Sequence, residues 1–122
     1  MNDSLPVFQQ IIELIENDII TGVYQTDDLI ISTTQIAKIY SVNPTTAVKA
    51  ISKMADAGII YKKRGIGMCV AKGAQENIKA RRKRIFIHKS INTLMKEATM
   101  LGISTDELIS IIKEKEGEMN HD

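Results

Sequence analysis

Two short segments of this sequence combine cationic, hydroxyl and glycine residues in a pattern that suits binding to a polyanion. In residues 45–53, Lys49 and Lys53 are accompanied by threonine and serine, and the segment contains no acid. Threonine hydroxyls donate and accept hydrogen bonds, and a lysine ammonium pairs with a phosphate or with the acceptors of guanine. The second segment, residues 62–67, joins three consecutive bases to two glycines, which let a backbone approach a phosphate closely.

The charges of the chain are segregated, although its net charge is only +1. Residues 3–28 contain six acids and no Lys or Arg, whereas residues 38–72 contain seven bases and the single acid Asp56. Such a local excess of positive charge can face a nucleic acid even when the whole protein is near neutral. The distribution of charge is therefore more informative than its sum.

Residues that usually carry catalysis or hold metals are sparse. Cys69 is the single cysteine, and His88 and His121 are far apart in the sequence, so neither a zinc site nor a disulfide framework is supported. The chain has no phosphate loop, no carboxylate pair beside a histidine and no spacing typical of a Ser/His/Asp triad. We predict that it is not an enzyme and uses no cofactor or metal, and that Cys69 is a buried small apolar residue.

The N-terminal residues and the hydropathy of the chain bear on its location. Residues 1–30 contain no base ahead of an apolar run, and no apolar stretch reaches the roughly 18 residues of a membrane span. We expect a cytoplasmic protein with no membrane partner.

Two helices are predicted ahead of the first polar segment. The first is expected to have Ser4 as its cap and Pro6 in its opening turn, and to end at Gly22. After a short strand or extended segment at residues 29–31, a second, short helix is expected to begin at Ser32 or Thr33 and to stop near Tyr40. The apolar positions of the first helix repeat at helical spacing: Phe8, Ile11, Ile12, Ile15 and Ile19.

A third helix is predicted from Pro44 to about Ala57, with Asn43 as its N-cap and Gly58 as its stop. Its apolar positions Ala47, Ala50, Ile51 and Met54 mark the buried face, and its outward face consists of Thr45, Thr46, Val48, Lys49, Ser52 and Lys53. A helix preceded by a short helix and a tight turn can enter the major groove of DNA, with its N-terminal residues nearest the bases. The third helix is therefore the predicted recognition element.

Residues 59–71 are predicted to form two strands around the basic, glycine-containing tip, a wing suited to phosphate or minor-groove contact. Residues 75–101 are expected to be helical until Gly102, and Ser104 with Glu107 matches a capping box at the start of a last helix. Neither helix can bury its apolar stripe alone, so both should pack on each other and on a second copy of the chain. The predicted dimer interface consists of Ile91, Leu94, Met95, Ala98, Leu101, Leu108, Ile109 and Ile112.

The predicted fold class is mostly α with a small β-hairpin wing (α+β). A winged helix-turn-helix DNA-binding domain is expected over residues 1–73. A two-helix C-terminal dimerisation segment is expected over residues 74–122.

The order of these residues resembles the GntR family of bacterial regulators, and the short tail is similar to the YtrA-like subgroup. The resemblance covers residues 5–73. The motifs that carry it are Leu5-Pro6-Val7-Phe8-Gln9-Gln10-Ile11, Ser32-x-x-Gln35-Ile36-Ala37, Val42-Asn43-Pro44-Thr45-Thr46-x-x-Lys49-Ala50, Ala57-Gly58-Ile59-Ile60 and Arg64-Gly65-x-Gly67-x-x-Val70.

The resemblance implies a two-fold dimer on a palindromic operator of double-stranded DNA, and repression of an operon that encodes an ABC-type transporter and the regulator itself. It implies DNA contacts from Ser32, Thr45, Thr46, Lys49, Arg64 and Gly67. The chain departs from the family at Thr34, where an arginine is usual, and at Val48, where a long polar side chain is common. We therefore expect fewer direct base contacts and an unusual or AT-rich operator. The full predicted DNA-binding set is Ser32, Thr34, Thr45, Thr46, Val48, Lys49, Lys53, Lys62, Lys63, Arg64, Gly65 and Gly67.

Three questions stay open at the level of sequence. A winged helix can instead bind only proteins, or bind DNA in plasmid partition or replication, although the acid-free face of the third helix argues against the first. The basic run Lys79, Arg81, Arg82, Lys83 and Arg84 is either a solvated surface or a set of contacts to flanking phosphates. A small-molecule effector has no support in the sequence, because its pocket would have to form between helices or across the dimer.

Overall fold

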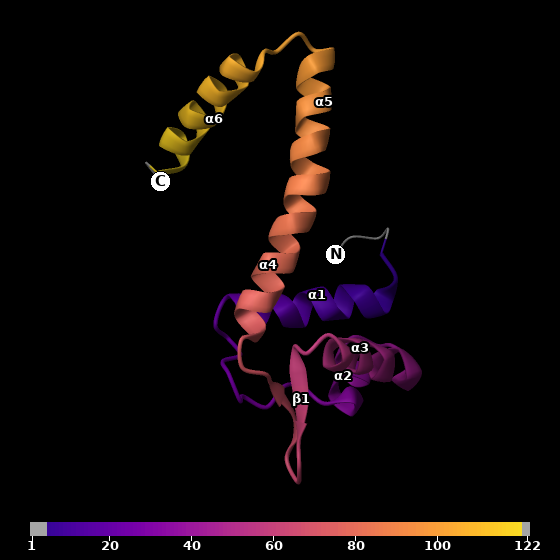
Figure 1. Cartoon of the computed structure of the whole chain (residues 1–122). Helices are drawn as coiled ribbons and strands as arrows, with labels where there is room; N and C mark the ends of the chain where they lie inside the picture. Colours follow the sequence, from indigo (N-terminus) through magenta and orange to yellow (C-terminus); the bar gives the residue numbers. More distant parts are fainter. Residues whose placement is uncertain (1–4, 121–122) are drawn as a thin grey trace. The chain divides into compact units, whose positions relative to one another are not determined.

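The computed structural model describes residues 5–120 (Figure 1), so the predicted cap Ser4 and His121 lie outside the described residues. The elements follow in the order α1 (Val7–Ile20), α2 (Thr33–Ile39), α3 (Pro44–Asp56), β1 (Ile60–Lys63), β2 (Gly67–Val70), α4 (Ala74–Phe86), the π-helix η1 (Ile87–Ile91), α5 (Asn92–Met100) and α6 (Thr105–Asn120). The fold is mostly helical with one antiparallel hairpin, as predicted. No helix among the described residues is long and apolar enough to cross a membrane.

The chain divides into two compact units, an N-terminal unit that ends at Arg81 and a C-terminal unit that begins at Arg82. The N-terminal unit is built on α3, which packs against both α1 and α2. The side chains predicted for the inner face of α3 are all buried, and they share one core with the isoleucines of α1. That core contains Ile11, Ile15, Ile19, Ile30, Ile36, Ala47, Ala50, Ile51, Met54, Ile59, Ile60, Val70, Ala74 and Ile78.

Local side-chain bonds fix where α2 and α3 begin. Ser32 caps α2: its Oγ accepts from the backbone N–H of Gln35 at 3.1 Å, and its own N–H donates to Oε1 of Gln35 at 2.9 Å. Asn43 caps α3, because its Oδ1 accepts from the backbone N–H of Thr45 at 2.9 Å, and Pro44 is the first helical residue. Both caps satisfy backbone donors that a helix start leaves unpaired. Of the two alternatives for the cap of α2, the structure has Ser32.

The wing is the antiparallel pair of β1 and β2, with Ile60 opposite Val70 and Lys63 opposite Gly67. The strands run further toward the tip than predicted, so Lys62 and Lys63 lie within β1, and the turn is residues 64–66. The reason is the tight closure of this turn, in which the N–H of Ile66 donates to the carbonyl of Lys63 at 3.0 Å. As predicted, residues 29–31 are extended, and they lie along the free edge of β2 through a bridge between Leu29 and Cys69.

The C-terminal unit contains the end of α4, then η1, α5 and α6. The predicted helix over residues 75–101 is present, since α4, η1 and α5 follow one another without a gap from Ala74 to Met100, with a π-helical stretch at Ile87–Ile91. The last helix, α6, begins where predicted, since Oγ of Ser104 accepts from the N–H of Glu107 at 3.1 Å. Among the described residues of this unit, only Ala98 and Leu108 are buried in the single chain. The other predicted interface residues are at least partly exposed, with Leu101 74% exposed. With two buried side chains among its described residues, this unit has little core of its own.

Candidate nucleic-acid interface

The outward face of α3 presents the residues that the sequence predicted. Four of these side chains are exposed: Thr45, Val48, Lys49 and Lys53. Thr46, next to Thr45 at the N-terminal end of α3, is half-buried. No acid occupies the first turn of α3. This surface combines hydroxyl donors, one apolar side chain and two cations, which can contact base edges and phosphates in a major groove.

Lys49 does not extend freely into solvent. Its Nζ lies 4.2 Å from the centroid of the Phe8 ring of α1, a cation–π contact. Such a contact contributes about 0.5–1 kcal/mol at an exposed site and restricts where the ammonium can reach. Helical periodicity assigned Phe8 only to the core, and no local pattern could have found this role, because the two residues lie on different helices.

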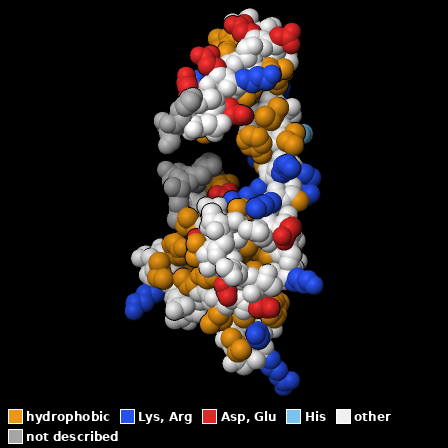
Figure 2. Space-filling view, turned by 90° about the vertical axis from the view of Figure 1, so that its left-hand side faces the viewer, with side chains coloured by type: hydrophobic (Ala, Val, Ile, Leu, Met, Phe, Trp, Pro, Cys, Tyr) orange, Lys and Arg blue, Asp and Glu red, His pale blue; other side chains and the backbone are white. Residues whose placement is uncertain are grey.

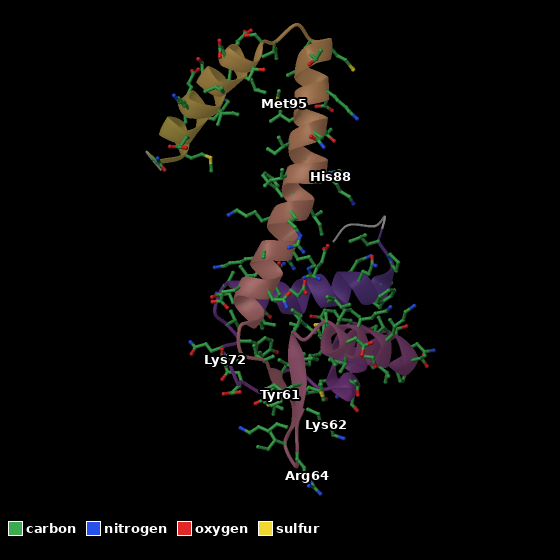
Figure 3. All side chains as sticks on the ribbon, viewed as in Figure 1. Tyr61, Lys62, Arg64, Lys72, His88 and Met95 are labelled. Carbon is green, nitrogen blue, oxygen red and sulfur yellow. The ribbon has the colours of Figure 1, made fainter. Side chains whose placement is uncertain are left out.

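The wing carries its charge on both faces and at its tip. Lys62 lies opposite Met68 and Lys63 opposite Gly67, so the two lysines point to opposite faces of the hairpin. Arg64 stands at the tip and points away from the hairpin (Figure 3). Figure 2 shows Lys and Arg side chains at this end of the N-terminal unit. The tip is thus a cationic projection that can approach the phosphates of a duplex.

A groove of about 240 Å³ brings residues from three elements to one surface. It lies between the wing and the start of α2, and it places Ser32 and Gly67, two of the predicted contacts, in the same lining as Ile51 of α3. Much of the lining is apolar, and Leu29 and Ile66 are 54% and 56% exposed. The sequence did not predict that these two side chains belong to the face that carries Ser32 and Gly67.

Gly67 is required by the shape of the wing. Its φ is +135°, and a Cβ at this position would lie 3.0 Å from Cδ1 of Leu29. Only glycine adopts such a φ without strain, so this residue lets the 27–30 segment lie against β2. The backbone bonds of that segment include the N–H of Ile30 to the carbonyl of Met68 at 2.9 Å. Gly67 therefore positions the wing on the body of the unit.

A side-chain hydrogen bond also joins the wing to the turn that contains Asp27, just ahead of the extended residues 29–31. The hydroxyl of Tyr61 in β1 donates to Oδ1 of Asp27 at 2.6 Å. This bond is the main reason why the pKa of Tyr61 is raised to about 12, because losing the phenolic proton would place an anion beside the carboxylate. Asp27 itself has a φ of +69°, in the left-handed region. Tyr61 is a wing-positioning residue that the sequence alone did not indicate.

The basic run that follows the wing is split between two environments. Arg81 is turned inward, where its Nη2 donates to Oε2 of Glu16, a buried acid of α1. Lys79, Lys83 and Arg84 are exposed. The run is therefore not one uniform solvated or DNA-facing surface, because the guanidinium of Arg81 pairs with the buried Glu16 while its side chain stays 37% exposed.

Cys69 is buried in β2, as predicted. Cys69 is 1% exposed, and its backbone pairs with that of Leu29 in an isolated bridge.

Comparison with known proteins agrees with this geometry. Residues 8–70 match the family described as bacterial regulatory proteins, gntR family. The HTH-type transcriptional repressor YtrA of Bacillus subtilis (strain 168) is 28% identical over 111 residues, which are 91% of this chain and 85% of that protein. The predicted resemblance to the GntR family and its YtrA-like subgroup is confirmed.

Solved structures share the fold. A GntR-family transcriptional regulator from Bacteroides thetaiotaomicron has a TM-score of 0.78 and 30% identity, and the match covers 93% of this chain and 99% of that one. The DNA-binding domain of AraR, solved in complex with operator ORX1, has a TM-score of 0.52 and 30% identity over 55% of this chain and 81% of that one. With a matching family model over more than half of its length, the chain belongs to the gntR family of bacterial regulatory proteins, which are DNA-binding regulators of transcription and not enzymes.

Proposed function

We propose that this regulator is a dimeric repressor that binds a palindromic operator through residues 1–73 and pairs through residues 74–122. It acts in the cytoplasm on an operon that encodes an ABC-type transporter and the regulator itself. The observation that carries the proposal is the contrast between the two units. One presents an acid-free helix face beside a cationic wing, and the other leaves its apolar side chains exposed.

The DNA-binding half of the proposal assigns distinct roles to α3 and the wing. The N-terminal residues of α3 enter the major groove, where Thr45 and Thr46 contact base edges and Val48 packs against thymine methyl groups. Lys49 and Lys53 contact phosphates or guanines from the same helix. Ser32 and Thr34 at the start of α2, and the wing residues Lys62, Lys63, Arg64, Gly65 and Gly67, approach the flanking backbone and fix the register. The DNA-binding domain of AraR, which shares this fold and was solved in complex with operator ORX1, supports DNA binding by this unit.

The dimer half of the proposal rests on apolar area. Leu94, Met95, Ile109 and Ile112 are between 36% and 49% exposed, and Leu101 is 74% exposed. Figure 2 shows hydrophobic side chains gathered on the visible face of the C-terminal unit. Contiguous apolar surface of this kind marks an interaction site in a water-exposed domain. A second copy of the chain would cover it and provide two recognition helices, as a palindromic operator requires.

The repressor role is supported by similarity to the YtrA repressor along most of the chain. Repression follows physically if the operator overlaps the promoter, because a bound dimer then excludes the polymerase.

Selection of binding sites from random duplex DNA, followed by sedimentation of the complex, tests the proposal. We expect an inverted repeat bound by two chains, located upstream of the regulator's own gene and beside genes for a transporter ATPase and permease. A chain truncated after Gly73 should sediment as a monomer, whereas the full chain sediments as a dimer. A selected site without two-fold symmetry, or equal association states of the two chains, contradicts the proposal.

A further inference from the structure

The groove between the wing and the start of α2 presents apolar side chains beside the predicted DNA contacts. Its volume is about 240 Å³, and Ile30 and Ile51 in its lining belong to the buried core. Leu29 and Ile66 line the same groove but are more than half exposed. Figure 2 shows hydrophobic side chains next to Lys and Arg side chains at this end of the N-terminal unit. The groove therefore exposes apolar area on a surface that otherwise suits a polyanion.

Leu29 and Ile66 form one patch, although they belong to different segments. Ile66 lies in the turn of the wing, and Leu29 belongs to the extended segment that pairs with β2. The side chain of Leu29 reaches the end of the wing, since its Cδ1 lies 3.0 Å from the position that a Cβ at Gly67 would occupy. Exposed apolar residues that occur singly need no explanation, whereas two that share one groove mark a binding surface. We call Leu29 and Ile66 the apolar pair.

The charges around the apolar pair favour DNA over an apolar protein as its partner. None of the described residues that line the groove is charged, but Lys63 and Arg64 are exposed and closely precede Ile66 in the hairpin. An apolar protein surface would desolvate these cations without neutralising them, whereas phosphates pair with them. A DNA strand alternates its phosphates with sugars whose C–H groups are apolar. Apolar side chains beside cations match that alternation.

We propose that the apolar pair packs against deoxyribose sugars that line the minor groove of the operator, where the wing approaches it. This inference rests on the proposed function, because it requires the wing to lie on DNA. The cations of the wing bind phosphates, and the apolar pair adds affinity that does not depend on salt. The contact uses residues of the N-terminal unit alone.

The apolar pair also enables the wing to recognise the sugar. In a ribonucleotide, the 2′-hydroxyl is displayed in the minor groove. A hydroxyl placed against leucine and isoleucine loses its water without gaining a hydrogen bond, which is unfavourable. A serine in place of either residue can bond that hydroxyl. The apolar pair therefore selects deoxyribose at the positions that it contacts, and this selection distinguishes a direct contact from an effect on the shape of the wing.

The test uses the full chain, its selected operator, and a set of duplexes in which one nucleotide at a time is replaced by the ribonucleotide with the same base. The variants are Leu29→Ser and Ile66→Ser, which lie on different segments outside the buried core and test the proposal independently. Val23→Ser is the matched control, because Val23 is 66% exposed in the same unit and does not line the groove. Circular dichroism checks the fold of each chain before binding is measured.

Each serine variant should bind the unmodified operator about five- to tenfold more weakly than the wild type, since about half of a large apolar side chain is then no longer buried against DNA. The slope of log affinity against log salt should stay within about 0.3 of the wild-type slope, because no charge is removed. Ribonucleotides that face the wing should weaken binding by the wild type about fivefold, and binding by the serine variants less than about twofold. A changed sugar pucker acts on every chain alike, so the difference between chains reports the hydroxyl.

The control should behave as the wild type does in all three measurements. Folded serine variants that bind the operator as tightly as the wild type overturn the inference, and so does a ribonucleotide penalty that is equal in all chains. An equal loss of affinity in Val23→Ser also overturns it, because the groove is then not the cause. A wild-type chain that binds selected and random duplexes equally contradicts the proposed function itself.

Discussion

Replacing Lys63 and Arg64 by glutamine removes two charges from the wing while keeping side chains of similar length. Both residues are exposed, and Arg64 points away from the hairpin at its tip (Figure 3). Neither belongs to the buried core. The substitution should therefore leave the fold intact and report on the electrostatics of DNA binding alone.

The expected magnitude follows from counterion release. Each phosphate neutralised by a cation contributes about 0.9 to the slope of log affinity against log salt. If each side chain contacts one phosphate, the slope decreases by about 1.8 in the double variant. Between about 50 and 200 mM salt, the ratio of the wild-type affinity for the operator to that of the variant should then fall by about tenfold.

Fluorescence anisotropy of a labelled operator over a series of salt concentrations measures these slopes. The matched control replaces Lys72 and Lys113 by glutamine, because both are exposed and Lys72 lies at the opposite end of the hairpin from Arg64 (Figure 3). It removes the same net charge away from the tip and should leave the slope near that of wild type. Equal slopes for the wing variant and the wild type, or equal losses in both variants, refute the assignment of the tip to phosphates.

Other positions give further tests. Lys49→Ala should weaken operator binding by about 1–2 kcal/mol, since it removes a charged contact, and leave the dimer intact in sedimentation; unchanged affinity in a gel-shift titration would remove Lys49 from the interface. Gly67→Ala should lower the free energy of unfolding in urea by about 1–3 kcal/mol, because the φ of +135° is strained for any residue with a Cβ. Gly117→Ala, in the last turn of α6 with open space around it, should instead be neutral or stabilising by up to about 1 kcal/mol, and equal effects would contradict the strain argument. The phenolate absorbance that Tyr61→Phe removes should titrate near pH 12. Because the folded-state pKa of Tyr61 is raised above the ordinary value of 10.0, its contribution to stability is complete below pH 10 and is lost as the pH rises toward 12; a step near pH 10 would show that its hydrogen bond is absent.

Local sequence determined α3, the predicted recognition element, because its signals act over a few residues. Asn43 caps α3 through the adjacent turn, Pro44 fits the first helical position, and Gly58, with a φ of +76°, ends the helix. The apolar spacing then decided which face of α3 is buried. These features depend on bonds within one turn, so they could be predicted before any packing was known.

The wing was predicted less accurately, because strand ends depend on pairing. The sequence placed Lys62 and Lys63 in the tip, whereas the ladder with β2 extends to Lys63. Strand propensity disfavours lysine only weakly, so cross-strand pairing decides where β1 ends. Leu29 lies close to Gly67 for a similar reason, since residues 27–30 pair with the free edge of β2 through backbone hydrogen bonds.

Contacts between distant residues were decided by tertiary structure alone. Glu16 was counted among the six acids of residues 3–28 and Arg81 with a basic run, yet they form an ion pair in which the glutamate is buried. Lys49 was assigned to the outward face correctly, but its stacking on Phe8 was not foreseen. Periodicity indicates which face of a helix a residue occupies. Which side chain it contacts there depends on how α1 packs against α3 and α4. The sequence by itself thus determined helix α3, the presence of the wing and the family, and the tertiary structure decided where the wing strands end and how the charges are held in place.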